Sequence, residues 1–121
     1  MRADRLRTIL RVGLLLAFLY FGLEKLLGLP GAVALYDALG FGQWPRYVTG
    51  TVETVSALLL LSPLAPYACL ALVATMAVGF TAKLLLVGPP VWHLAALAVL
   101  ALVLLWLDMR ARRRAGAPPA A

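Results

Sequence analysis

The chain has 121 residues, of which 64% are hydrophobic and 13% are charged, about half the charged share of a typical soluble domain. This composition argues against a soluble domain and predicts one small integral membrane domain in contact with the lipid bilayer. The net charge of +6 comes mainly from arginines near the two ends. Because no basic face or recognition motif accompanies them, we expect topology signals and contacts with anionic lipid, and no nucleic-acid binding.

Four apolar segments predict four membrane spans, at about residues 6–27, 45–61, 67–87 and 91–109. About twenty apolar residues are needed to cross the hydrocarbon, and the second segment approaches this only with Gln43 and Trp44 before it. Prolines and glycines separate the segments, because proline cannot continue a helix. A cleaved signal peptide ending near Ala34 is the competing reading of the first segment; the charged Glu24 and Lys25 before that point argue against it.

Two shorter stretches complete the predicted domain organisation. Residues 32–39 predict a short interfacial or re-entrant helix between the first two spans, broken at Gly40 to Gly42. Residues 1–109 then form a single four-span domain, and residues 110–121 form a basic, then alanine- and proline-rich tail that we expect to be disordered. The predicted fold is all-α, a four-helix transmembrane bundle.

The number of spans and the charge distribution predict the same orientation. An even number of spans places both termini on one side, and the positive-inside rule places arginine-rich ends in the cytoplasm. The short helix at residues 32–39 then lies on the outer side.

Five ionisable side chains fall in the outer half of this predicted bundle: Glu24, Lys25, Glu53, Lys83 and His93. A carboxylate such as Glu53 is costly among apolar helices and normally faces the bundle interior with a partner. Thr49 and Ser56 lie on the same helical stripe as Glu53, and together with the five ionisable groups they are the candidates for an outward-facing polar pocket. We expect only one of the neighbours Glu24 and Lys25 to point inward.

Less specific readings of these residues stay open. Lys25 and Lys83 lie near helix ends and could extend to the interface, and His93 could be an ordinary interfacial side chain. No closely spaced metal-ligand motif is present, so no metal is predicted, and no catalytic residue can be assigned because no nucleophile–base motif is legible. The lone Cys69 is expected to be a buried apolar residue.

Several of these motifs together resemble the DoxX-like family of small four-helix membrane proteins. They are Arg11-x-Gly13, Phe21-Gly-Leu-Glu-Lys25, Gly50-x-x-Glu53, and Lys83 and His93 around a Gly-Pro turn. The resemblance spans about residues 11–108. It implies a link to membrane oxidoreductases, quinone- or thiol-linked, with Lys25 and Glu53 the positions most expected to matter. It also implies the bacterial cytoplasmic (inner) membrane.

The resemblance favours a small subunit or accessory factor of a membrane redox system. The chain lacks the cysteine pair of redox-active four-helix relatives, so a quinone or a partner redox subunit must hold the electrons. Two alternatives stay open: a small proton-coupled transporter of the multidrug-resistance type, or an assembly factor for other membrane proteins. A homo-oligomer is compatible with each of them, and an autonomous enzyme is the least supported.

Overall fold

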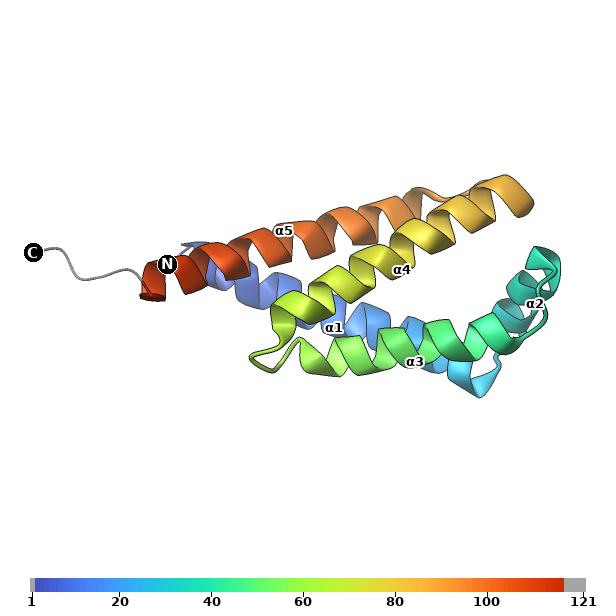
Figure 1. Ribbon diagram of the computed structural model, residues 1–121, viewed down its shortest axis with the longest axis horizontal. Coiled ribbons are helices and arrows are strands. Elements are labelled where there is room, and N and C mark those ends of the chain that lie inside the picture. Colours follow the sequence, from blue (N-terminus) through green and yellow to red (C-terminus); the bar gives the residue numbers. More distant parts are fainter. Residues whose placement is uncertain (1, 117–121) are drawn as a thin grey trace, which may run out of the picture.

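The computed structural model describes residues 2–116, which are all-α, with five helices and no strand among them. The helices are α1 (Arg2–Leu27), α2 (Pro30–Leu39), α3 (Trp44–Leu59), α4 (Ala65–Leu86) and α5 (Trp92–Gly116). Figure 1 shows α1, α3, α4 and α5 running along the long axis of the molecule, with the short α2 at one end. The start of α1 and the end of α5 lie together at the opposite end.

Three of the helices formed by residues 2–116 are long and apolar enough to cross a membrane: α1, α4 and α5. The protein is therefore an integral membrane protein in contact with lipid. Helix α3 has 16 residues, a length of about 24 Å, which is shorter than the roughly 30 Å of a bilayer's hydrocarbon core. It is also the helix that contains Arg46 and Glu53, so it does not meet the length and composition of a span by itself.

The C-terminal helix is longer than the sequence predicts. Helix α5 continues through the arginine-rich stretch to Gly116, so the expectation of disorder directly after residue 109 is wrong for residues 110–116. Arginine and alanine favour helix, and Arg112 pairs with Asp108 one turn earlier, which supports the helical extension. The part of the predicted tail at residues 117–121 lies outside the described residues.

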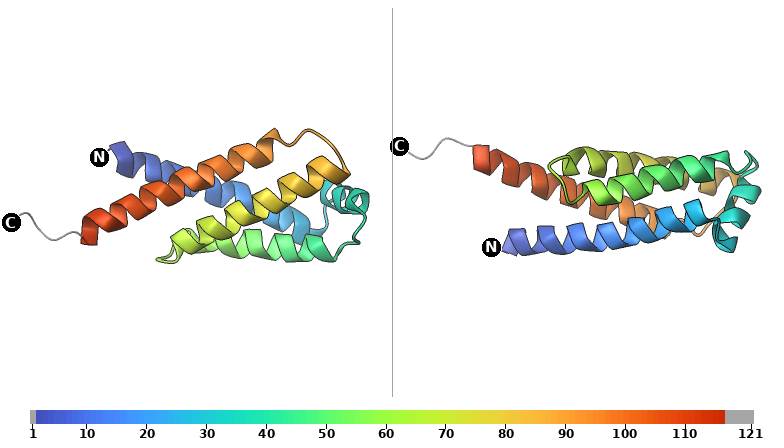
Figure 2. Two further views of the ribbon diagram at one scale, coloured as in Figure 1. Left: turned by 45° about the horizontal axis from the view of Figure 1, so that its top comes forward. Right: turned by 90° about the horizontal axis from the view of Figure 1, so that it is seen from below.

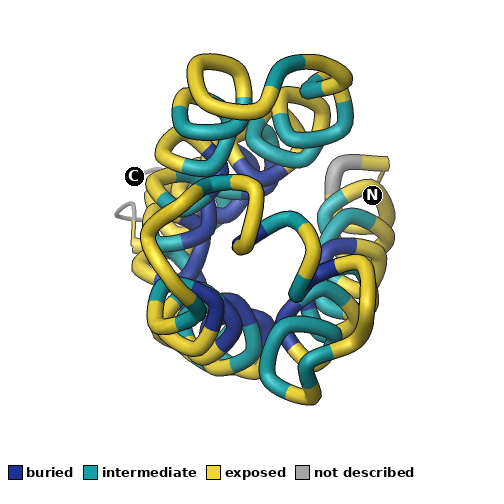
Figure 3. Tube along the Cα trace, turned by 90° about the vertical axis from the view of Figure 1, so that its right-hand side faces the viewer, coloured by how far each residue is buried: buried dark blue, intermediate teal, exposed yellow. Residues whose placement is uncertain are grey.

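The interior of the bundle is apolar and lies between the four long helices. Its fully buried side chains include Phe18, Leu60, Leu72 and Leu104, one from each long helix or its end. In Figure 3, which looks at the α2 end, the buried positions face inward and the exposed positions face outward. Figure 2 shows α1 lying along α3 and α4 along α5, and these are the most extensive helix contacts.

Candidate functional site

The contact between α1 and α3 depends on two glycines. A Cβ atom on Gly22 would lie 2.8 Å from the backbone nitrogen of Thr54 and 3.0 Å from the carbonyl oxygen of Gly50. A Cβ atom on Gly50 would lie 3.0 Å from the carbonyl oxygen of Gly22. Glycine at both positions lets the two backbones approach closely, as small residues do between membrane helices. Lys25 and Glu53 each follow one of these glycines by three residues, so the close approach brings their side chains together.

Lys25 and Glu53 form a buried ion pair. The Lys25 Nζ lies 3.0 Å from Glu53 Oε1 and donates a 3.1 Å hydrogen bond to Glu53 Oε2. Lys25 also lies 5.7 Å from the centre of the Phe21 ring. The Glu53 side chain is completely buried, yet within residues 2–116 its Oε1 receives no hydrogen bond of acceptable geometry. Lys25 is thus the cation that pairs with the buried carboxylate.

This ion pair lies in the wall of a cavity of about 200 Å³ at the α2 end of the bundle. The polar side chains that line it are Glu24, Lys25, Tyr36, Thr49, Glu53, Thr75, Lys83 and His93. The apolar side chains that line it include Phe21, Leu35, Leu39, Met76, Leu94 and Leu97. All five helices contribute, so the cavity exists only in the assembled fold. Polar and apolar side chains both line it, which suits an amphiphilic ligand.

The structure brings six of the seven candidate residues to this one cavity. Glu24 and Lys25 both line it, so the expectation that only one of them points inward is wrong. Ser56 does not line it; its side chain is buried one turn farther along α3. Lys83 donates a 2.5 Å hydrogen bond to the Pro90 carbonyl, and the His93 ring lies edge-on to Trp92 at 5.9 Å. Lys83 and His93 therefore flank the α4–α5 turn at the mouth of the cavity.

Tyr36 on α2 is a lining residue that was not among the sequence candidates. Its side chain is buried, and this burial raises the pKa of the phenol above its ordinary value of 10.0, an effect partly opposed by a hydrogen bond with Thr49. A phenol is protonated at neutral pH with or without this shift, so Tyr36 can donate a hydrogen bond in the cavity wall. The sequence pattern offered no signal for this, because the docking of α2 onto the bundle depends on tertiary contacts.

Arg46 is a second residue that the sequence reading missed. It is 5% exposed, donates from Nη1 to the carbonyl oxygen of Lys25, and donates a 2.7 Å hydrogen bond from Nε to the Gln43 side chain. It thereby ties the start of α3 to the end of α1, directly beside the ion pair. The position of Arg46 in the sequence could have revealed its role. Arg46, Gly50 and Glu53 are separated by four and three residues and therefore lie on one face of the helix.

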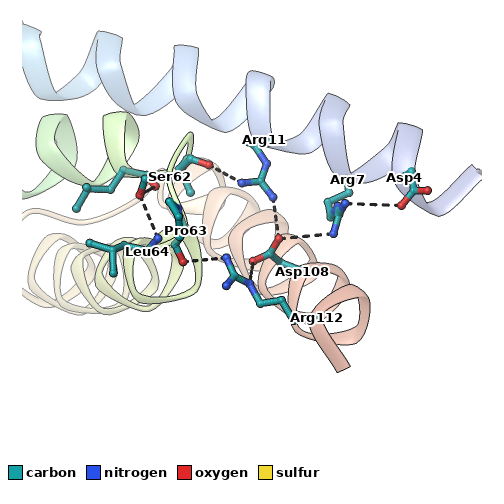
Figure 4. Close-up of polar contacts among 10 residues, drawn as sticks. Asp4, Arg7, Arg11, Ser62, Pro63, Leu64, Asp108 and Arg112 are labelled. Carbon is teal, nitrogen blue, oxygen red and sulfur yellow. Dashed lines mark hydrogen bonds and ion pairs between the residues drawn. The ribbon is translucent and has the colours of Figure 1, made fainter. Parts of the chain in front are cut away.

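A second polar cluster lies at the opposite end of the bundle (Figure 4). Asp108, almost completely buried, lies 2.8 Å from Arg11 on α1, 2.9 Å from Arg112 and 3.8 Å from Arg7. Arg11 also donates to the Leu60 carbonyl at 2.5 Å, and Arg112 donates to the Pro63 carbonyl at 2.8 Å. This cluster joins α1 and α5 to the α3–α4 turn and is separate from the cavity.

The model of the DoxX-like family matches residues 9–107. The chain belongs to the DoxX-like family. No curated protein and no solved structure matches it significantly. The matched range includes every residue that lines the cavity, together with the Gly22–Gly50 contact and Arg46. The DoxX-like resemblance expected from the sequence motifs is thus confirmed for most of the chain.

The described residues also limit which chemistry the cavity can support. Within residues 2–116 no group of three His, Cys, Asp or Glu side chains is arranged to hold a metal ion. Cys69, the chain's single cysteine, is buried in the core, away from the cavity lining. What the cavity offers is two carboxylates, of which Glu53 is paired with an ammonium, together with several hydrogen-bond donors and apolar side chains. This arrangement can bind a polar ring or head group and exchange protons with it.

Proposed function

We propose that this DoxX-like protein is a small subunit of a membrane redox system and that its cavity binds the head group of a membrane quinone. The observation that supports this most is the buried Lys25–Glu53 pair in the wall of an amphiphilic cavity formed by membrane helices. Intramembrane ionisable groups that face a cavity generally mark ligand or proton sites. The volume of about 200 Å³ is below the roughly 300–1,000 Å³ of sites that enclose drug-sized ligands, so it suits a head group with its tail in lipid.

The residues present fit such a head group. Lys25, Tyr36 and His93 can donate hydrogen bonds to quinone oxygens, and Phe21 and Leu97 provide an apolar surface for the ring. A bound quinone supplies the capacity to accept electrons, which these side chains lack. Because the chain has one cysteine and no dithiol, the electrons must come from a partner redox subunit. The contribution of this chain is to bind the head group and to hold or release protons at the Glu53 carboxylate.

We also propose that α3 makes the fourth membrane crossing, with both ends of the chain in the cytoplasm of a bacterium and the cavity facing outward. The arginine-rich ends lie together at one end of the bundle, as the positive-inside rule requires for that orientation. Pairing of Glu53 with Lys25 lowers the cost of placing a carboxylate at this depth. Residues before Trp44 and after Leu59 can lengthen the short crossing at its two ends.

Labelling of single cysteines in sealed inner-membrane vesicles of known orientation tests this topology. In a Cys69→Ala background, we expect Asp37→Cys on α2 to react with an impermeant maleimide from the periplasmic face. Arg114→Cys on α5 should react only from the cytoplasmic face; both native side chains are exposed. Reaction of both positions from the same face would contradict the proposed orientation.

Quinone binding can be tested with the purified protein in nanodiscs and a short-chain ubiquinone analogue. We expect Glu53→Gln and Tyr36→Phe to weaken binding by about tenfold each, the effect of losing one polar contact of about 1.4 kcal/mol. Both changes keep the side-chain size nearly constant. The matched control is Asp37→Asn, because Asp37 is an exposed carboxylate bonded to Gln43 outside the cavity. Wild-type affinity in both cavity variants, or equal loss in the control, would overturn the proposal.

A further inference from the structure

The end of the bundle opposite the cavity contains a second hollow, a groove of about 420 Å³ between the start of α1 and the end of α5. Four arginines line it: Arg7, Arg110, Arg112 and Arg114. Asp4 and Leu107 also contribute to its wall. The groove includes the helical extension of α5 beyond residue 109, so it exists because the arginine-rich stretch is ordered as helix.

Three of the four arginines of the groove, Arg7, Arg110 and Arg112, have contacts that hold them, but the groove as a whole is not neutralised. Arg7 and Arg112 both face the buried Asp108, at 3.8 Å and 2.9 Å, which fixes their guanidinium groups beside the groove (Figure 4). Arg110 lies over the ring of Trp106, 5.2 Å from its centre. Four arginines thus face two carboxylates, Asp4 and Asp108, and Asp108 is shared with Arg11. The groove carries an excess of positive charge that an anion can balance.

The depth of the groove indicates which anion reaches it. It begins at Leu107, where the apolar part of α5 ends, and the exposed Trp106 lies beside it as an interface anchor. This is the level of lipid head groups, whose common anion is a phosphate ester. The planar guanidinium group matches phosphate oxygens with two parallel hydrogen bonds, which makes arginine well suited to this ligand.

We propose that this groove binds the phosphate group of an anionic phospholipid, with Arg110 and Arg114 as its direct ligands. Arg7 and Arg112 are positioning residues there, because they already bond to Asp108. The site does not depend on what the cavity at the other end binds. Both arginine ligands lie beyond the range that matches the family, which ends at residue 107.

The test measures lipid retention by native mass spectrometry after purification from nanodiscs that contain equal amounts of phosphatidylglycerol and phosphatidylcholine. We expect the wild-type protein to retain phosphatidylglycerol in preference, and Arg110→Gln/Arg114→Gln to reduce this preference about tenfold. The matched control is Arg5→Gln/Arg113→Gln, which removes two exposed arginines from the same two helix ends without touching the groove. Thermal unfolding of both variants verifies that they fold.

Each outcome decides the proposal. Loss of the preference in the groove variant alone supports a specific phosphate site. Equal loss in the control shows diffuse attraction between a basic end and anionic lipid, and overturns it. An unchanged preference in the groove variant shows that Arg110 and Arg114 are not the ligands and overturns it. Uptake of inorganic phosphate by a wild-type protein that shows no preference for phosphatidylglycerol shows that the groove binds the free anion, and overturns the lipid assignment. Equal retention of the two lipids by the wild-type protein also overturns it.

Discussion

Gly22→Ala should destabilise the protein by about 1–3 kcal/mol, and Gly22→Val should prevent α1 and α3 from packing at all. A single added methyl group at Gly22 would lie 2.8 Å from a backbone nitrogen of α3, and a backbone cannot rotate aside as a side chain can. The helices must then separate by several tenths of an ångström along their whole contact. This movement also pulls Lys25 away from Glu53, one turn farther along.

Cys69 can report the thermal unfolding of these glycine variants. Cys69 is the only cysteine and is completely buried, so a thiol-reactive dye labels it as the bundle opens on heating. The matched control is Gly13→Ala on the same helix, where an added Cβ meets no atom within 4 Å. We expect Gly13→Ala to leave the labelling temperature unchanged or to raise it, because alanine favours helix over glycine. An unchanged labelling temperature in Gly22→Ala would show that the glycine contact is not tight.

The charged residues that line the cavity were partly predictable from the sequence, because charged side chains are rare in apolar segments. Glu53, Lys25 and Lys83 stand out in any hydropathy reading, and the alternating direction of successive segments places them at similar depth. The gathering of these charged residues at the α2 end follows from that depth argument alone. Ser56 was among the candidates for the pocket because it lies on the same face of its helix as Glu53. A helix face extends beyond the part of it that lines a cavity. The structure places Ser56 one turn too far along α3.

Other parts of the site depended on contacts that no local pattern encodes. Tyr36 reaches the cavity only because α2 folds back over the bundle end, and the sequence shows α2 as a short polar-interrupted stretch. For Arg46 the helical spacing to Gly50 and Glu53 was an available signal, but its bonds to the Lys25 carbonyl and to Gln43 exist only in the folded structure. Asp108 was not among the sequence candidates, yet it pairs with Arg11 of α1 and Arg112 of α5 and so joins these two helices.

Lys25→Met should destabilise the protein more than any other single change in the cavity, by about 3–5 kcal/mol, because it leaves the fully buried Glu53 carboxylate without its cation. Lys25→Met/Glu53→Leu removes both charges and should recover most of that loss, since replacement of a buried ion pair by apolar side chains is often neutral or stabilising.

Cys69 labelling on heating measures both variants, together with Glu53→Leu, as a double-mutant cycle. If Lys25→Met unfolds at the wild-type temperature, the carboxylate does not need the lysine and the buried pair is not the organising interaction of the site. If the double variant is as stable as the wild-type protein but no longer binds the quinone analogue, the pair is maintained for its ligand rather than for the fold. If it is stable and still binds, Glu53 holds no proton for the ligand, and binding must depend on the remaining donors, Tyr36 and His93. The cycle therefore separates the structural contribution of Lys25 and Glu53 from their chemical one.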